Sequence, residues 1–104
     1  MSDELPPASP AERDFADTEA VFSALAHPTR RHILLVLKFC GGEVSAGDIA
    51  KRFTCTWPTT TRHLRVLEDA GLVRVEKRGR ERMYRVDKER LLTITSTWLT
   101  SFAG

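Results

Sequence analysis

Residues 45–72, SAGDIAKRFTCTWPTTTRHLRVLEDAGL, and residues 73–86, VRVEKRGRERMYRV, decide the fold of this 104-residue chain. The first stretch predicts two short helices joined by a tight turn, because Ser45 and Thr56 are good N-cap residues at the right spacing. The second predicts a β-hairpin with Gly79 at its turn. A helix-turn-helix followed by a basic hairpin is typical of a winged helix, whose commonest use is to place one helix in the major groove of DNA.

The spacing of apolar residues gives each of these two helices a buried face. In the helix that begins after Ser45, Asp48 completes a reciprocal capping box with Ser45. Its buried positions are Ala46, Ile49, Ala50 and Phe53, and the turn after it falls at Thr54-Cys55. The helix that begins after Thr56 ends at Gly71. It turns Thr60, Leu64 and Leu67 inward at i, i+4 and i+7, which leaves Arg62, Arg65 and Asp69 outside.

Further helices flank this motif on both sides. We expect residues 1–8 to form a disordered tail and residues 9–104 to form one domain. Helix signals predict one helix over about residues 9–25, with a capping box at its start, and a second over about residues 28–40, closed by a glycine pair. The second is apolar on most sides, which is typical of a central core helix. The expected fold class is therefore mainly α with a small β-hairpin.

The last helix, which Asp87 can cap, has no charged residue after Arg90. Its apolar side chains would form an exposed patch on a monomer. We expect that patch to be buried against a second subunit together with the first helix, and the alternative is a helix folded back on its own core. A two-fold dimer would also present two recognition helices to a palindromic site. The predicted interface consists of Phe15, Phe22, Leu91, Ile94, Trp98, Leu99 and Phe102.

Composition and charge narrow the class of protein. Apolar residues make up 41% and charged residues 29%, as in ordinary globular proteins; the sequence shows no membrane segment, secretory signal or disulfide framework, so we expect a cytoplasmic protein. Residues 51–90 carry twelve basic and six acidic side chains, whereas residues 1–20 carry one basic and six acidic ones. Positive charge therefore coincides with the helix-turn-helix and hairpin, which favours nucleic acid over a merely solvated basic face.

Four segments together resemble one known family. They read ALAHPTRRHILLVL (residues 24–37), GDIAKRF (47–53), PTTTRHLRVLEDAGLV (58–73) and RGRERMYRV (78–86). In this order they are similar to the ArsR/SmtB family of bacterial winged-helix repressors, over roughly residues 21–86. The resemblance implies a homodimer through the first and last helices and a fourth helix that contacts double-stranded DNA.

Candidate DNA contacts follow from the resemblance by position. Trp57 stands where the family often has glutamine, and it can pack on a thymine methyl or serve as a half-buried anchor between helices. Thr56 can bond a phosphate or only cap its helix, and His63 can be structural or touch DNA. The hairpin arginines would contact phosphate or the minor groove. The predicted DNA-binding residues are Thr56, Trp57, Thr59, Thr61, Arg62, His63, Arg65, Arg78, Arg80 and Arg82.

The metal sites of the family find no match in this sequence. The third helix lacks a cysteine pair, and the last helix lacks histidine and carboxylate ligands. His27, His32, His63, Cys40 and Cys55 are scattered without zinc-like spacing. We interpret Cys40 as a buried small hydrophobe at a helix end. Cys55 lies in the turn next to basic residues, where a redox response is conceivable but is the less favoured interpretation. We therefore expect no metal and no cofactor, and the chain resembles the metal-independent, SdpR-like branch.

The sequence thus favours a transcriptional repressor that occupies a palindromic operator as a homodimer. One alternative is a winged-helix module that binds proteins instead of DNA, and a protein anti-repressor is a candidate partner. Another is a metal- or redox-responsive repressor that uses Cys40 or Cys55. We find no nucleophile–base pair and no phosphate-binding glycine loop, so we do not expect an enzyme.

Overall fold

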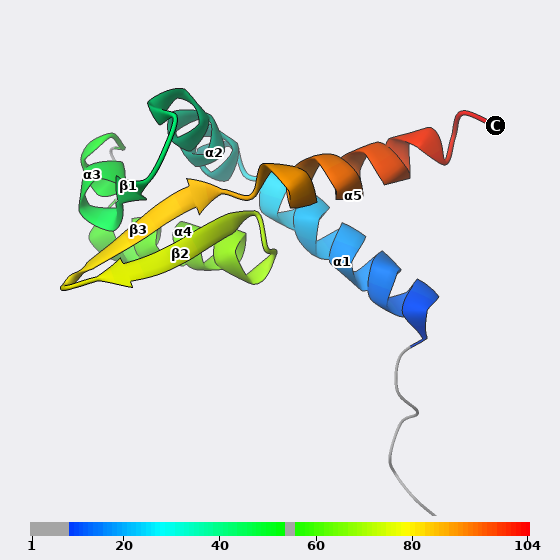
Figure 1. The fold of residues 1–104 in the computed structure, drawn as a ribbon, viewed down its shortest axis with the longest axis horizontal. Helices are drawn as coiled ribbons and strands as arrows, with labels where there is room; N and C mark the ends of the chain where they lie inside the picture. Colours follow the sequence, from blue (N-terminus) through cyan, green and yellow to red (C-terminus); the bar gives the residue numbers. More distant parts are fainter. Residues whose placement is uncertain (1–8, 54–55) are drawn as a thin grey trace, which may run out of the picture.

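The computed structural model describes residues 9–53 and 56–104. Five helices and a small sheet make up this part of the chain (Figure 1). This order confirms the predicted mainly helical winged helix, whereas the predicted tail and the turn at Thr54-Cys55 lie outside the described residues. The elements are α1 (Pro10–Leu25), α2 (Pro28–Cys40), β1 (Val44–Ser45), α3 (Ala46–Lys51), α4 (Trp57–Asp69), β2 (Val73–Arg78), β3 (Glu81–Val86) and α5 (Lys88–Thr100).

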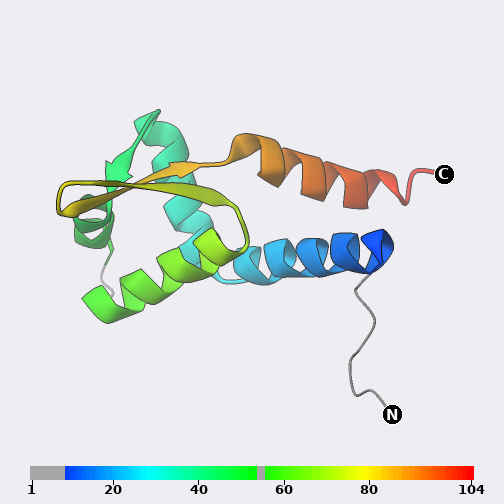
Figure 2. The same ribbon diagram turned by 60° about the horizontal axis from the view of Figure 1, so that its bottom comes forward.

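The helices α1 and α5 extend away from the other elements. Both project from the same end of the molecule, and α2, α3, α4 and the sheet gather at the other end (Figures 1 and 2). Phe22 of α1 and Trp98 of α5 meet edge to face, with ring centroids 5.0 Å apart. The predicted dimerisation helices therefore contact each other.

Local capping accounts for the helix boundaries. Ser9 and Glu12 form the predicted reciprocal capping box at the start of α1, with bonds of 3.0 and 3.2 Å. At α3 only half of the predicted box forms: Ser45 accepts from the Asp48 amide at 3.1 Å, but the Asp48 carboxylate lies 4.0 Å from the Lys51 ammonium instead. The expected reciprocal bond is thus replaced by an ion pair one turn further along the helix.

The sheet contains one strand more than the hairpin predicted. Its order is β1-β3-β2, and Val44 of β1 lies opposite Tyr84 of β3. The predicted hairpin turn at Gly79 is confirmed: Arg78 and Glu81 pair across the strands, and Gly79-Arg80 connect them. Gly79 has φ +60°, a conformation that glycine favours at the first position of a two-residue turn.

The core lies where α1, α2, α3, α4 and the sheet meet. Its largest fully buried side chains are Val21, Ile33, Leu37, Ile49, Leu64, Leu67 and Leu72. The expectation that α2 is buried on most sides is wrong: Leu35 is 49% exposed and Phe39 is 78% exposed, because no other described element covers that side. Cys40 was interpreted from the sequence as a buried small hydrophobe, but it is exposed at the end of this helix.

Arg90 joins three helices where α5 begins. Its Nε donates to the carbonyl of Ala70 at the end of α4, at 2.9 Å, and its Nη2 lies 3.6 Å from Asp17 of α1. Gly71 makes room for this side chain, since a Cβ there would come within 2.3 Å of the Arg90 Nε. Gly71 also has φ +75°, so it is required both to end α4 and to admit Arg90.

No helix in residues 9–53 and 56–104 has the length and apolar character needed to cross a membrane.

Candidate nucleic-acid interface

The start of α4 is held by its own threonines. The Thr56 side chain accepts from the Thr59 amide at 3.4 Å and donates to the Thr59 hydroxyl at 3.0 Å. Thr60 is buried and bonds the Thr56 carbonyl at 3.1 Å. Of the two interpretations of Thr56, the helix cap fits this geometry. These bonds fix the first turn of α4 with its outer face toward solvent.

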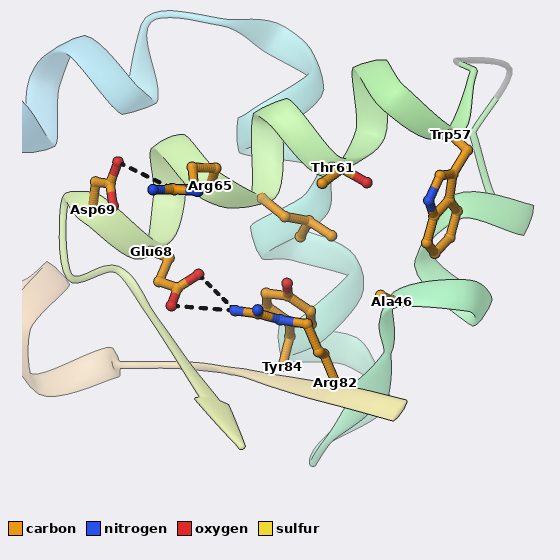
Figure 3. Close-up of a pocket in the computed structure, with 9 residues that line it drawn as sticks. Ala46, Trp57, Thr61, Arg65, Glu68, Asp69, Arg82 and Tyr84 are labelled. Atoms are coloured by element: carbon orange, nitrogen blue, oxygen red, sulfur yellow. Dashed lines mark hydrogen bonds and ion pairs between the residues drawn. The ribbon is translucent and has the colours of Figure 1, made fainter. Parts of the chain in front are cut away.

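Four of the predicted DNA contacts line one cavity between α4 and β3. Trp57, Thr61 and Arg65 come from α4, and Arg82 comes from the hairpin (Figure 3). The cavity has a volume of about 380 Å³. Trp57 is 55% exposed, which is more than an anchor packed between helices would be. The fold therefore brings helix and hairpin residues to one open face.

Two carboxylates on α4 hold arginines of this face. The Glu68 carboxylate lies 3.1 Å from Arg82, and Asp69 lies 3.9 Å from Arg65 (Figure 3). All four side chains are at least one-third exposed, so each pair contributes only about 0–1 kcal/mol. A phosphate could displace either carboxylate at little cost in stability.

The arginines of the hairpin differ in their surroundings. Arg78 lies 2.6 Å from Glu43 and 3.1 Å from Glu76, so it ties the hairpin to the segment before β1. Arg80 in the turn and Arg62 on α4 are exposed and have no ion-pair partner in residues 9–53 and 56–104. Among the predicted DNA-binding arginines, Arg62 and Arg80 are therefore the most available to a phosphate or a base.

His63 lies on the opposite side of α4, facing the core. It is 9% exposed, its Nδ1 is 3.2 Å from an Arg30 Nη1, and its ring is 4.4 Å from that of His27. Burial, then the neighbouring His27, Arg30 and Arg62, lower the pKa of His63 below its ordinary 6.5. Of the two interpretations of His63, the structural one fits this placement.

We predict that the free energy of unfolding falls as the pH drops below about 6.5, because His63 of the unfolded chain then binds a proton that the folded protein resists. Above that range this contribution is fully present. Its slope is at most about 1.4 kcal/mol per pH unit. The His63→Asn variant, whose amide oxygen can still accept from Arg30, should lose this slope in urea unfolding at several pH values.

The matched control for this test is His32→Asn, at an exposed histidine on α2. It should keep the slope of the unchanged protein. A slope that survives in His63→Asn would mean that another group carries it.

Sequence reasoning missed the role of two arginines in the segment after α1. Arg30 donates from Nε to the Ala24 carbonyl at 2.8 Å and from Nη2 to the Ser23 carbonyl at 3.1 Å. Arg31 donates to the Leu25 carbonyl at 2.7 Å. A basic pair just beyond a helix end commonly bonds the last free carbonyls of that helix, so the spacing could have revealed it. Arg30 thereby connects the end of α1 to His63 in α4.

The predicted dimer residues divide into two groups. Leu91 and Ile94 are partly buried against the core, and Phe22 is partly buried beside Trp98. Four others remain exposed: Phe15 (67%), Trp98 (43%), Leu99 (61%) and Phe102 (73%). Folding back on the core thus accounts for the first half of α5 but not for its end.

Of the candidate metal or redox residues that the structure describes, His27 and His63 lie together, and His32 and Cys40 lie apart from them. His32 packs edge to face on Phe53 at 4.8 Å, His27 caps α2 through Nδ1 at 3.1 Å from the Thr29 amide, and Cys55 lies outside the described residues. Within the described part of the chain, no three His, Cys, Asp or Glu side chains come close enough to hold a metal ion.

Comparison with known proteins assigns this arrangement to a family. A helix-turn-helix domain model matches residues 25–76. The transcriptional repressor SdpR of Bacillus subtilis (strain 168) is 35% identical over 82 residues, which are 79% of this chain and 88% of that repressor. A solved ArsR family transcriptional regulator, 35% identical, superposes with a TM-score of 0.75 and covers 83% of this chain and 86% of its own. The chain belongs to the ArsR/SmtB family of winged-helix transcriptional repressors.

Other members of the ArsR/SmtB family are similar over most of the chain. The arsenical resistance operon repressor of Staphylococcus xylosus is 32% identical over 75 residues, which are 72% of this chain and 70% of that protein. Membership confirms the family and the fold class predicted from the sequence. It also makes this protein a DNA-binding regulator of transcription and not an enzyme.

Proposed function

We propose that this protein represses transcription by occupying a palindromic operator as a homodimer, and that it does so in the cytoplasm without sensing a metal. The observation that carries the proposal is the separation of two surfaces on one chain. The open face of α4 and the hairpin lies at one end, and the exposed apolar residues of α1 and α5 lie at the other. Two copies joined through the second surface would present two copies of the first.

The operator-binding residues follow from exposure and charge. We propose that Trp57, Thr59, Thr61 and Arg62 approach base edges, that Arg65, Arg80 and Arg82 contact phosphates, and that Arg78 supports the hairpin. Neutralised phosphates would supply much of the affinity, so binding should weaken steeply as salt rises. An inducing signal, from a protein anti-repressor or another source, would act through unequal affinity for the DNA-competent state.

A mobility-shift assay on DNA from upstream of the protein's own gene tests the proposal, with scrambled competitor, two salt concentrations, and added chelator. A specific, salt-sensitive shift that ignores chelator would support it. A shift that depends on chelator would overturn the metal-independent mechanism. No specific shift in any condition would favour a protein-binding module.

Replacing Arg62 by alanine should weaken specific operator binding about 10- to 100-fold, because an arginine that bonds a base edge contributes about 1–3 kcal/mol of discrimination. Arg62 is exposed and makes no ion pair in the described part of the chain, so the fold and the dimer should survive. Titration in mobility-shift assays measures the first effect, and sizing by light scattering the second. Arg13→Ala on α1 is the control and should bind normally. A monomeric Arg62→Ala would make Arg62 a structural residue.

Replacing Glu68 by glutamine should strengthen DNA binding, most of all at low salt, because Arg82 then reaches its phosphate without leaving a carboxylate. The salt dependence of the dissociation constant measures this. The control is Glu89→Gln, which removes the same charge from an exposed residue of α5 and should have little effect on DNA binding. In an Arg82→Gln background the gain from Glu68→Gln should largely vanish. An undiminished gain would show that Glu68 acts by general repulsion of DNA and not by holding Arg82.

A further inference from the structure

A second hollow lies far from the α4 face, between α2 and the first turns of α5. These segments lie side by side (Figures 1 and 2). The groove has a volume of about 540 Å³ and walls of aliphatic side chains, including Leu34 and Leu35 of α2 and Leu91 and Leu92 of α5. Leu35 is 49% exposed and Leu92 is 65% exposed. Two large apolar side chains thus face an open groove on a protein whose main core is complete without them.

Three cations surround this groove. Arg31 and Lys38 come from α2 and Lys88 from α5, and the lining includes no acidic residue. None of the three has an ion-pair partner in residues 9–53 and 56–104. Arg31 uses one guanidinium nitrogen to bond the Leu25 carbonyl, which leaves its other nitrogens available. The rim is therefore positively charged, and the walls are apolar.

We propose that this groove binds a single-chain aliphatic carboxylate, with the chain along the leucines and the carboxylate among Arg31, Lys38 and Lys88. Its volume falls within the range of about 300–1,000 Å³ found for small-molecule sites. Each methylene buried on such walls raises affinity about fourfold. The carboxylate accepts charge-assisted hydrogen bonds from guanidinium and ammonium groups. Both halves of the ligand thus find a complementary surface.

A second copy of the chain is the main competing occupant of the groove. Its α1 carries Glu12, Asp14 and Asp17, which are exposed and of the right charge. The groove shares Leu91 with the predicted dimer interface. However, the exposed aromatic residues of α5, Trp98 and Phe102, lie toward its opposite end, whereas the groove involves only its first turns. A dimer formed through the aromatic end can therefore leave the groove open.

Calorimetric titration of the full chain with dodecanoate, below its micelle concentration and without DNA, tests the proposal independently of the proposed function. We expect saturable binding, about 15-fold weaker for decanoate because it lacks two methylenes, and no comparable binding of dodecyltrimethylammonium, which has the opposite charge. Absence of saturable binding, or equal binding of the cationic amphiphile, would overturn the proposal. Failure to bind would also favour the second copy as occupant.

Variants locate the site. Lys38→Gln with Lys88→Gln changes two exposed side chains, and it should weaken dodecanoate binding about tenfold or more. Leu92→Gln should weaken it as well, with a smaller difference between decanoate and dodecanoate. The control, Lys51→Gln with Lys77→Gln, removes the same charge outside the groove and should bind normally. An equal loss in the control, or no loss in Leu92→Gln, would overturn the assignment to this groove.

Discussion

Replacing Arg30 by methionine is expected to lower the free energy of unfolding by about 3 kcal/mol, because hydrogen bonds from a charged group contribute about 1.5–3 kcal/mol each before exposure reduces them. Methionine keeps much of the aliphatic stem but removes the bonds to the Ala24 and Ser23 carbonyls and to His63. Two carbonyl acceptors at the end of α1 would lose their donor at once. Urea unfolding at one fixed protein concentration measures the change.

The control for Arg30 is Arg52→Met. Arg52 is an exposed residue at the end of α3, and its replacement should change stability by less than about 0.5 kcal/mol. An Arg30→Met protein as stable as this control would show that the bonds to α1 are replaced by water without loss.

The second large effect is expected from Leu99→Glu, which should convert the proposed dimer into a monomer. Leu99 is 61% exposed on the single chain, so a carboxylate there is harmless to the monomer. In a two-fold interface each subunit would bury one such carboxylate without a partner, at a cost of several kcal/mol. Operator affinity should fall about 100-fold or more, because each half-site would then be bound alone. Sizing by light scattering and mobility-shift titration measure the two effects.

Thr97→Glu is the matched control for Leu99→Glu. It places the same charge on α5 but two residues away, on a different side of the helix. This variant should remain dimeric and bind the operator normally. A Leu99→Glu protein that also remains dimeric would remove the end of α5 from the interface.

Local signals were sufficient to predict most of the fold. Each helix start depends on contacts within three residues, as at Ser9, Thr56 and Asp87, and a glycine of positive φ follows α2 and α4. These preferences act over a few residues and can be recognised in a single sequence. The strand β1 escaped prediction because it has two residues and exists through pairing with β3, about forty positions later.

Which side chains are exposed and which are paired on the surface was less predictable, because residues far apart in the sequence determine it. Periodicity identifies an apolar side of α2, but it cannot say that no element covers Leu35 and Phe39. The contact of Glu68 with Arg82 joins α4 to the hairpin across fourteen positions, so no spacing rule indicates it. His63 is different: it is adjacent to Leu64 and three residues after Thr60, on the inward side of α4. That spacing would have favoured the structural role, which the sequence left open beside a DNA contact.

Arg30 and Arg90 have a consequence for the spacing of operator half-sites. Arg30 connects α1 to the middle of α4, and Arg90 connects α1 and α5 to its end. These two contacts hold α4 at its middle and at its end, so α4 cannot tilt freely against α1. In a two-fold dimer, the separation of the two α4 helices would therefore be fixed. Operators whose half-sites are further apart by one base pair, about 3.4 Å, would bind poorly whatever the sequence of their bases.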